Sequence, residues 1–313
     1  ITYSEEGLLE WASSGISSCS LIADITLTDE WSPIGSENAP YSAVFNGNGH
    51  TVSGLRVDGT EGHIGFFGYI GQNGSVLGLK LEGASLTGSE SSGGIAGENL
   101  GRIEDCHVSG TIEGSGIAEG GIAGRNRGTI SECTASVESA GNGDAGGIAG
   151  INYGLIKDSG SDGTIRGEYA IGGIAGLNAD GGRISGCTFS GEVIDGYYAG
   201  GIAGCNDNKS IIEKCSFTGR INDMDWYIGG IAGLNSLESI IQECASSGTI
   251  IGHDETGGIT GYNFAAYIYA CSFSGSVYSD TIAGGIAGIS MGPLAACYSS
   301  GTVKCGSTAG GIT

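Results

Sequence analysis

One five-residue string, Gly-Gly-Ile-Ala-Gly, recurs along the chain and constrains the fold more than any other feature. It occurs intact seven times, with its isoleucine at Ile95, Ile122, Ile148, Ile174, Ile202, Ile231 and Ile286. Degenerate copies extend the series from Phe66 to Ile312, at intervals of 26 to 29 residues. A unit of this length cannot bury its own apolar face, so it has to stack on its neighbours as one coil of a solenoid.

The interior of each repeat indicates which kind of solenoid to expect. Short β-branched segments alternate with glycine, and no stretch has the helical period over the length that a helix needs. We expect three short strands per coil and parallel pairing between coils about 4.8 Å apart. The crossover rule for parallel strands makes the winding right-handed. The sequence therefore predicts an all-β, right-handed parallel β-helix of about ten coils over residues 61–313.

Residues 1–60 have a different pattern and are expected to cap the N-terminal end. Ser4 can cap a short helix over residues 5–13 that stops at Gly15 and turns Leu8, Leu9 and Trp11 toward the solenoid. Residues 21–27 and 43–57 then read as irregular first coils. The last residues lie inside a further copy of the motif, so we expect the chain to be part of a larger multidomain protein.

Two residue types recur at one position of successive repeats and predict side-chain ladders. Asparagine tolerates the left-handed conformation of a sharp turn, and a stacked amide can donate to the next coil. In-register cysteines point the same way, so we expect packed thiols rather than disulfides or a metal site. The asparagines are Asn99, Asn126, Asn152, Asn178, Asn206, Asn235 and Asn263, followed by Ser290, and the cysteines are Cys106, Cys133, Cys187, Cys215, Cys244, Cys271 and Cys297, with Ser159 in the missing coil.

Charge and motif content exclude several classes of function. Twelve Lys+Arg against 34 Asp+Glu give a formal charge of -22, which repels nucleic acid and anionic lipid. The apolar runs fall far short of the roughly 20 residues that cross a bilayer, so no membrane insertion is expected. The sequence contains no His-Glu-x-x-His, phosphate loop or Cys-x-x-Cys. We therefore expect no metal ion, no cofactor and no catalytic residue.

The variable segment before each Gly-Gly pair carries the candidate ligand-binding residues. Tyr169, Tyr197 and Trp226 stand three residues before the first glycine in three successive coils, and acids cluster in the same segments. Such a column can hold sugar rings or a protein partner, can cleave a polysaccharide with paired carboxylates, or can simply pack across coils. The candidate site comprises Tyr169, Tyr197, Tyr198, Asp225, Trp226, Tyr227, His253, Asp254 and Glu255.

The repeat, read as Gly-Gly-Ile-Ala-Gly-x-Asn followed by Ile-x-x-Cys, resembles the GLUG-motif repeats of bacterial surface proteins. The segments Trp31-Ser32-Pro33-Ile34-Gly35 and Phe45-Asn46-Gly47-Asn48-Gly49 add to this resemblance. It implies a secreted or wall-anchored module, like those in adhesins and in non-catalytic regions of immunoglobulin A-specific metallopeptidases. On this basis we expect an adhesion or spacer module without its own chemistry, with a host glycan or host protein as partner. The alternative is a carbohydrate-active β-helix enzyme, a glycosidase or lyase.

Overall fold

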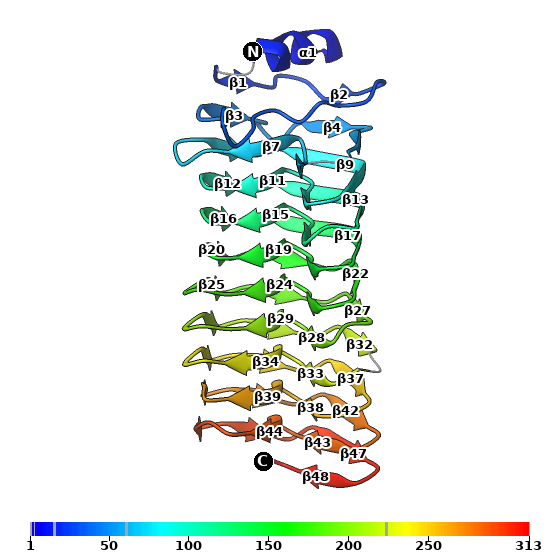
Figure 1. The fold of residues 1–313 in the computed structure, drawn as a ribbon, viewed down its shortest axis with the longest axis vertical. Coiled ribbons are helices and arrows are strands. Elements are labelled where there is room, and N and C mark those ends of the chain that lie inside the picture. Colours follow the sequence, from blue (N-terminus) through cyan, green and yellow to red (C-terminus); the bar gives the residue numbers. More distant parts are fainter. Residues whose placement is uncertain (1, 3, 15–16, 60–61, 223–224, 313) are drawn as a thin grey trace.

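The chain folds into an elongated parallel β-solenoid of about eleven turns with one short helix at its N-terminal end (Figure 1). The computed structural model describes all residues except 1, 3, 15–16, 60–61, 223–224 and 313. Every pairing between strands of successive coils is parallel. The all-β solenoid predicted from the repeat is therefore confirmed.

Each repeat contributes strands to four sheets, which we name S1 to S4, whereas the sequence predicted three strands per coil. S1 has eleven strands: β1 (Cys19–Ser20), β3 (Val44–Asn46), β8 (Ser75–Leu77), β12 (Arg102–Glu104), β16 (Thr129–Ser131), β20 (Leu155–Lys157), β25 (Arg183–Ser185), β30 (Ile211–Glu213), β35 (Ile240–Gln242), β40 (Tyr267–Tyr269) and β45 (Leu294–Ala295). S2 has ten: β6 (His63–Ile64), β10 (Ser91–Gly93), β14 (Ala118–Gly120), β18 (Asp144–Gly146), β23 (Ala170–Gly172), β28 (Tyr198–Gly200), β33 (Tyr227–Gly229), β38 (Thr256–Gly257), β43 (Ile282–Gly284) and β48 (Thr308–Gly310).

S3 and S4 complete each coil. S3 has nine strands: β7 (Phe67–Ile70), β11 (Ala96–Asn99), β15 (Ala123–Asn126), β19 (Ala149–Asn152), β24 (Ala175–Asn178), β29 (Ala203–Asn206), β34 (Ala232–Ser236), β39 (Thr260–Phe264) and β44 (Ala287–Ser290). S4 comprises β2 (Ile25–Thr26), β4 (Thr51–Ser53), β5 (Arg56–Asp58), β9 (Lys80–Gly88), β13 (His107–Gly114), β17 (Thr134–Gly141), β21 (Gly160–Ser161), β22 (Thr164–Gly167), β26 (Thr188–Phe189), β27 (Glu192–Ile194), β31 (Ser216–Phe217), β32 (Arg220–Asn222), β36 (Ala245–Ser246), β37 (Thr249–Gly252), β41 (Ser272–Phe273), β42 (Ser276–Ser279), β46 (Tyr298–Ser299) and β47 (Thr302–Cys305).

The Gly-Gly pair creates the extra sheet because it folds the chain sharply between S2 and S3. A Cβ atom on Gly93 would lie 2.4 Å from the carbonyl oxygen of Ala96, and one on Gly94 would lie 2.6 Å from the side chain of Val108. Only glycine fits a corner this tight. The isoleucine that follows the pair is fully buried from Ile95 to Ile286, and these isoleucines form the spine of one continuous core, whereas Ile312 in the last coil is exposed.

The N-terminal helix, α1 (Glu5–Ser14), covers the first coil as predicted. The Ser4 hydroxyl caps it by accepting a hydrogen bond from the Gly7 amide at 3.2 Å. Leu8 is fully buried and the Trp11 ring packs 5.2 Å from that of Phe45. Leu9 is exposed, so its expected place on the apolar face is wrong: the face that meets the solenoid is too narrow to include it. The expected stop at Gly15 lies outside the described residues.

The asparagine ladder is confirmed, but its backbone conformation differs from the prediction. Each buried amide donates to the amide oxygen of the next coil at 2.7 to 2.9 Å, from Asn99 to Asn263, and Asn263 donates to Ser290 at 3.0 Å. None of these asparagines has positive φ. A left-handed residue stands instead just before the cysteine position of each coil, at Asp105, Glu132, Asp158, Gly186, Lys214, Glu243, Ala270 and Ala296. In four coils, left-handed residues also stand two or three positions after the ladder asparagine, at Asp180, Asn208, Lys209, Leu237, Glu238 and Ala265. Left-handed turns therefore lie between S1 and S4 and, in these four coils, also between S3 and S1.

The cysteine ladder packs as predicted. All ten cysteines are free, and six of the seven ladder members are buried, Cys297 being half-buried. Each thiol donates to the carbonyl oxygen two residues earlier, as in Cys215 to Glu213 at 3.2 Å. In the coil without cysteine, the Ser159 hydroxyl makes the equivalent bond to Lys157 at 2.8 Å. The ladder thus contributes packing and local hydrogen bonds to the core.

Candidate functional site

The structure brings the candidate aromatic side chains together on one side of the solenoid, where S4 leads into S2. Backbone hydrogen bonds connect their segments from coil to coil: the Tyr198 amide donates to Tyr169 at 2.9 Å and the Tyr227 amide to Tyr197 at 3.4 Å. The Tyr197 and Trp226 rings lie 6.4 Å apart, and the Tyr169 and Tyr198 rings lie 5.5 Å apart. The column inferred from spacing is therefore a real cluster of rings.

The cluster has two layers with different exposure. Tyr198 and Tyr227 are half-buried and stack at 5.6 Å with an interplanar angle of 11°. Tyr169, Tyr197 and Trp226 lie outside them and are 53%, 36% and 49% exposed. Packing across coils accounts for the inner layer, whereas half of the surface of the outer rings is open to a ligand.

Sequence reasoning missed two members, Tyr262 and Phe264 of β39. Tyr262 stacks on Tyr227 at 5.3 Å, and Phe264 lies 5.8 Å from Tyr262 and is 43% exposed. Tyr262 occupies the variable position between the last motif glycine and the ladder asparagine, which holds Leu234 in the preceding coil. An aromatic residue at that position was the available signal. We call the seven residues Tyr169, Tyr197, Tyr198, Trp226, Tyr227, Tyr262 and Phe264 the aromatic face.

Five acids border the aromatic face, and we call them the acidic rim: Glu168, Asp195, Asp225, Asp254 and Glu255. The Asp254 amide donates to the Asp225 carbonyl oxygen at 3.5 Å, so these two acids lie in neighbouring coils at one register. Asp225 is exposed, whereas Asp254 accepts a hydrogen bond from the Thr281 hydroxyl. His253 is exposed and its Nδ1 lies 2.9 Å from Asp280, which places it beside the rim in an ion pair.

The electrostatic environment at the rim is negative. Burial, followed by the charge of Asp254, raises the pKa of Glu255, and the Oε2 atom of Glu255 is buried without a hydrogen-bond partner among the described residues. Burial and then the charge of Glu255 raise the pKa of the Tyr227 hydroxyl. The hydrogen bond to Asp280 is the main cause of the raised pKa of His253. The raised pKa values of Glu255 and Tyr227 mean that negative charge is disfavoured on these two side chains. The raised pKa of His253 means that positive charge is favoured on its ring.

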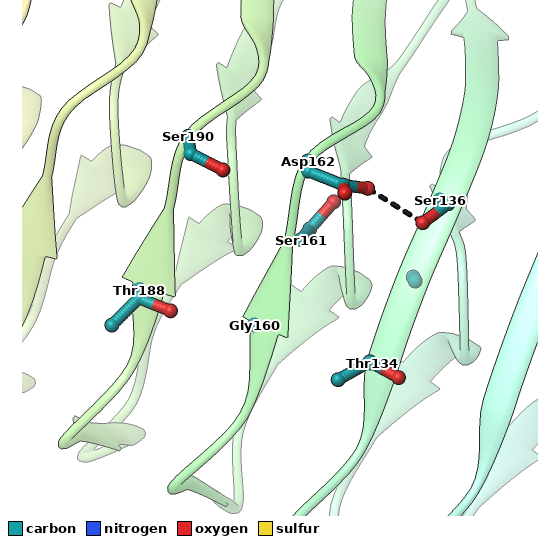
Figure 2. A pocket seen from close by; sticks show the side chains of 8 residues that line it. Thr134, Ser136, Gly160, Ser161, Asp162, Thr188 and Ser190 are labelled. Carbon is teal, nitrogen blue, oxygen red and sulfur yellow. Dashed lines mark hydrogen bonds between the residues drawn. The ribbon is translucent and has the colours of Figure 1, made fainter.

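A second surface feature is a pocket on S4 lined mainly by hydroxyl groups (Figure 2). Thr134, Ser136, Thr188 and Ser190 surround Gly160, whose missing side chain leaves the depression. Asp162 is its single carboxylate and accepts a hydrogen bond from Ser136 at 2.6 Å. Because glycosidases need two carboxyl groups, this pocket does not have the arrangement for glycoside hydrolysis.

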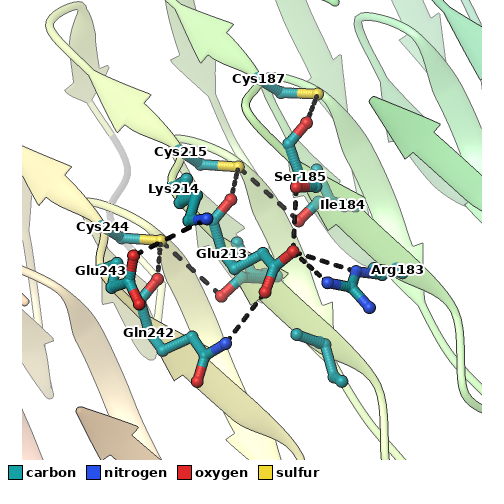
Figure 3. A network of polar contacts seen from close by, with 12 residues as sticks. Arg183, Ile184, Ser185, Cys187, Glu213, Lys214, Cys215, Gln242, Glu243 and Cys244 are labelled. Atoms are coloured by element: carbon teal, nitrogen blue, oxygen red, sulfur yellow. Dashed lines mark hydrogen bonds and ion pairs between the residues drawn. The ribbon is translucent and has the colours of Figure 1, made fainter. Parts of the chain in front are cut away.

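A third feature is the polar network on the outer side of S1 beside the cysteine ladder (Figure 3). Glu213 accepts hydrogen bonds from Arg183 Nε at 3.0 Å, Ser185 at 3.0 Å and Gln242 at 2.9 Å. Burial raises the pKa of Glu213, but these bonds outweigh it and hold the pKa below its usual range. Both carboxylate oxygens are satisfied internally, so the network stabilises S1.

Metal and membrane sites were also sought. Within the described residues, no group of three or more His, Cys, Asp or Glu side chains is placed to hold a metal ion. In that same part of the chain, the single helix is too short to span a bilayer.

The fold and the repeat together define a class, a parallel β-solenoid whose coils turn on a Gly-Gly corner. The family model of the GLUG motif matches residues 88–113, 167–194 and 195–222. Two curated proteins are similar over shorter stretches: halomucin of Haloquadratum walsbyi, 37% identical over 76 residues, and a candidate Gly-rich membrane protein of Evansella cellulosilytica, 35% identical over 99 residues. These stretches cover 24% and 28% of this chain but 1% and 12% of the relatives.

Two solved structures have a similar chain path. A candidate immunoglobulin A1 protease from Bacteroides ovatus is 21% identical with a TM-score of 0.46, over 98% of this chain and 83% of that chain. A second chain, named IgA1 protease, is 12% identical with a TM-score of 0.43, over 98% of this chain and 21% of its own. The match of the family model, and not these structures, confirms the resemblance to GLUG-motif repeats for residues 88–113, 167–194 and 195–222.

Proposed function

We propose that this protein is an extracellular adhesion or spacer module that binds a host glycan or host protein through the aromatic face and has no chemistry of its own. The observation that carries the proposal is the outer layer of Tyr169, Tyr197 and Trp226, exposed at one register in three successive coils. Large exposed aromatic side chains are typical of binding hot spots. The names of the relatives, a halomucin and a membrane protein, agree with a place at the cell surface.

The first prediction tests the face by removing two outer rings. The double variant Tyr197→Ala with Trp226→Ala is expected to lose binding to host-cell glycans or proteins on an array, while its thermal midpoint stays within a few degrees of the wild type. The reason is that half-exposed rings contribute contact area to a partner and little to the core.

The matched control is Tyr269→Ala with Tyr298→Ala, two exposed tyrosines outside the aromatic face. It should bind as the wild type does. A large drop in the thermal midpoint of the face variant would mean that the rings are structural, because losing a buried aromatic ring costs about 3–5 kcal/mol. Equal loss of binding in both variants would also contradict the proposal.

One observation favours the alternative, a carbohydrate-active enzyme. The partly buried, unpartnered oxygen of Glu255 and its raised pKa are features of a general acid. Cleavage of any polysaccharide by the wild type that disappears in Asp225→Asn with Glu255→Gln, while binding persists, would establish this alternative.

A further inference from the structure

The charge distribution around the aromatic face is uneven along the chain. Residues 221–303 contain seven acids and not one lysine or arginine, although the whole chain has twelve basic residues. This stretch supplies Asp225, Trp226, Tyr227, Asp254, Glu255, Tyr262 and Phe264. Toward the N-terminal end of the face, Arg166 lines a surface depression together with Glu168 and Asp195, so the acids there have a basic neighbour. The C-terminal half of the face therefore carries acids without a lysine or arginine from its own segment, and His253 is its single basic side chain, ion-paired with Asp280.

The chain also uses its tyrosines to hold cations. Arg127 lies over the ring of Tyr153 at 4.3 Å, and Lys304 lies 5.6 Å from the ring of Tyr278. Among the described residues these are the two cation–ring contacts, and neither involves the aromatic face. Trp226, which offers the strongest ring for a cation, is half-exposed beside exposed Asp225.

The aromatic rings and the neighbouring carboxylates together indicate which ligands the face can bind. A ring attracts a cation, and neighbouring carboxylates strengthen that attraction and repel anions. An acidic glycan would meet like charge at Asp225, Asp254 and Glu255. A neutral glycan could donate its hydroxyl groups to these carboxylates but would leave their negative charge uncompensated. Burial and neighbouring negative charge raise the pKa of Glu255 and of Tyr227, and a bound cation would lower both pKa values again.

The length of the aromatic face indicates whether its partner is a single amine or an extended polymer. Tyr169, Tyr197, Trp226 and Asp254 come from four successive coils, which places the ends of the face about 14 Å apart. This length exceeds one ammonium group and fits about four residues of an extended polypeptide. We propose that the aromatic face and acidic rim bind an extended polypeptide segment rich in lysine or arginine. This inference rests on the proposed function and names the chemistry of its partner.

The experiment compares three probes by calorimetry at low and physiological salt: an alternating Lys-Gly decapeptide, an alternating Glu-Gly decapeptide and a neutral β-linked glucose pentamer. The Lys-Gly peptide should bind the wild type and the other two should not. The triple variant Asp225→Asn, Asp254→Asn and Glu255→Gln should weaken peptide binding at least about tenfold. Trp226→Ala should weaken it without any change of charge.

The matched control removes the same charge elsewhere, through Asp58→Asn, Glu82→Gln and Glu138→Gln, three exposed acids on S4. It should bind the Lys-Gly peptide as the wild type does. Equal weakening in both triple variants would overturn the inference, because the peptide would then bind to net charge alone. Binding of the glucose pentamer that is lost in Trp226→Ala, without peptide binding, would overturn the inference and leave the proposed function standing. If no probe and no host ligand binds the face, both are wrong.

Discussion

Glu119 is the most unusual single residue in the interior. It lies on β14 at a position that holds Ala145 and Ile171 in the following coils, and it is fully buried. Both carboxylate oxygens lack a hydrogen-bond partner among the described residues. Burial, and then the charge of Asp144, raises the pKa of Glu119 to about 7, and burial raises the pKa of Asp144 to about 7 as well. The buried site therefore favours the protonated form of each carboxyl group in the folded chain.

The second prediction is that stability falls as the pH rises from about 4.5 to about 7. In this window the folded chain holds protons on Glu119 and Asp144 that the unfolded chain has released, so raising the pH favours unfolding. Above about pH 7 this contribution is fully lost. Urea unfolding at several pH values measures the slope.

The double variant Glu119→Gln with Asp144→Asn is expected to have a flatter slope than the wild type over the same window. Glu113→Gln, an exposed acid close in sequence, should keep the wild-type slope. An unchanged slope in the double variant would show that neither buried acid titrates with folding.

At the scale of the element, the side-chain ladders explain why the coils keep one register. Each ladder amide from Asn126 to Asn263 accepts from the coil before and donates to the coil after, and it also donates to backbone carbonyls nearby, as Asn178 does to Gly182 at 3.1 Å. A shift of register would leave buried amides unpaired, which costs about 1–3 kcal/mol for each group. The ladder therefore specifies the stacking as well as stabilising it.

The third prediction concerns one rung of this ladder. Asn178→Ala should lower the free energy of unfolding by about 1–3 kcal/mol, because it leaves the Asn152 donor and the Asn206 acceptor without that partner. Chemical denaturation measures the change. Asn142 is an exposed asparagine outside the ladder, so Asn142→Ala should leave the free energy of unfolding nearly unchanged. A similar loss of stability in both variants would mean that a ladder asparagine contributes no more than an exposed one.

The sequence predicts this level of structure well because repetition makes a position visible several times. The solenoid and both ladders follow from the repeat spacing. The helix expected over residues 5–13 follows from its Ser4 cap and apolar face, and in the structure it extends to Ser14. The fourth sheet could not be predicted, because the dipeptide Gly-Gly does not show by itself that one strand ends and another begins at the pair. The left-handed residue before each cysteine is also hidden, because Asp105, Lys214 and Ala296 share no side-chain chemistry. Tyr262 was missed because its contact with Tyr227 crosses from S2 to S3 between coils, and Phe264 was missed because it joins the cluster through Tyr262 of its own strand.

At the scale of the whole molecule, charge is the dominant feature. The 34 acids outnumber the twelve lysines and arginines by 22, so most carboxylates lack a basic residue to neutralise their charge one to one. Parallel stacking places the same register position of successive coils about 4.8 Å apart, which brings acids such as Asp225 and Asp254 together. The solenoid therefore carries considerable self-repulsion, which its continuous apolar core has to offset.

The fourth prediction is that added salt stabilises the molecule. Raising sodium chloride from about 10 mM to about 500 mM shortens the screening length from about 30 Å to a few ångströms and weakens repulsion between acids in neighbouring coils. The same salt weakens exposed ion pairs such as Lys209–Glu238, but such pairs contribute about 1 kcal/mol or less. With an excess of acids this large, relief of repulsion should outweigh the lost pairs, and the thermal midpoint should rise.

Calorimetric melting in sodium chloride measures this shift, and choline chloride at equal ionic strength is the matched control for binding of a particular cation. Equal increases in both salts would indicate screening. A larger increase in sodium chloride would indicate site binding of sodium. A lower midpoint in both salts would mean that the ion pairs outweigh the repulsion. In that case the triple variant Asp225→Asn, Asp254→Asn and Glu255→Gln should not be more stable than the wild type at low salt. If repulsion dominates, that variant should melt at a higher temperature at low salt, and the difference should vanish at high salt.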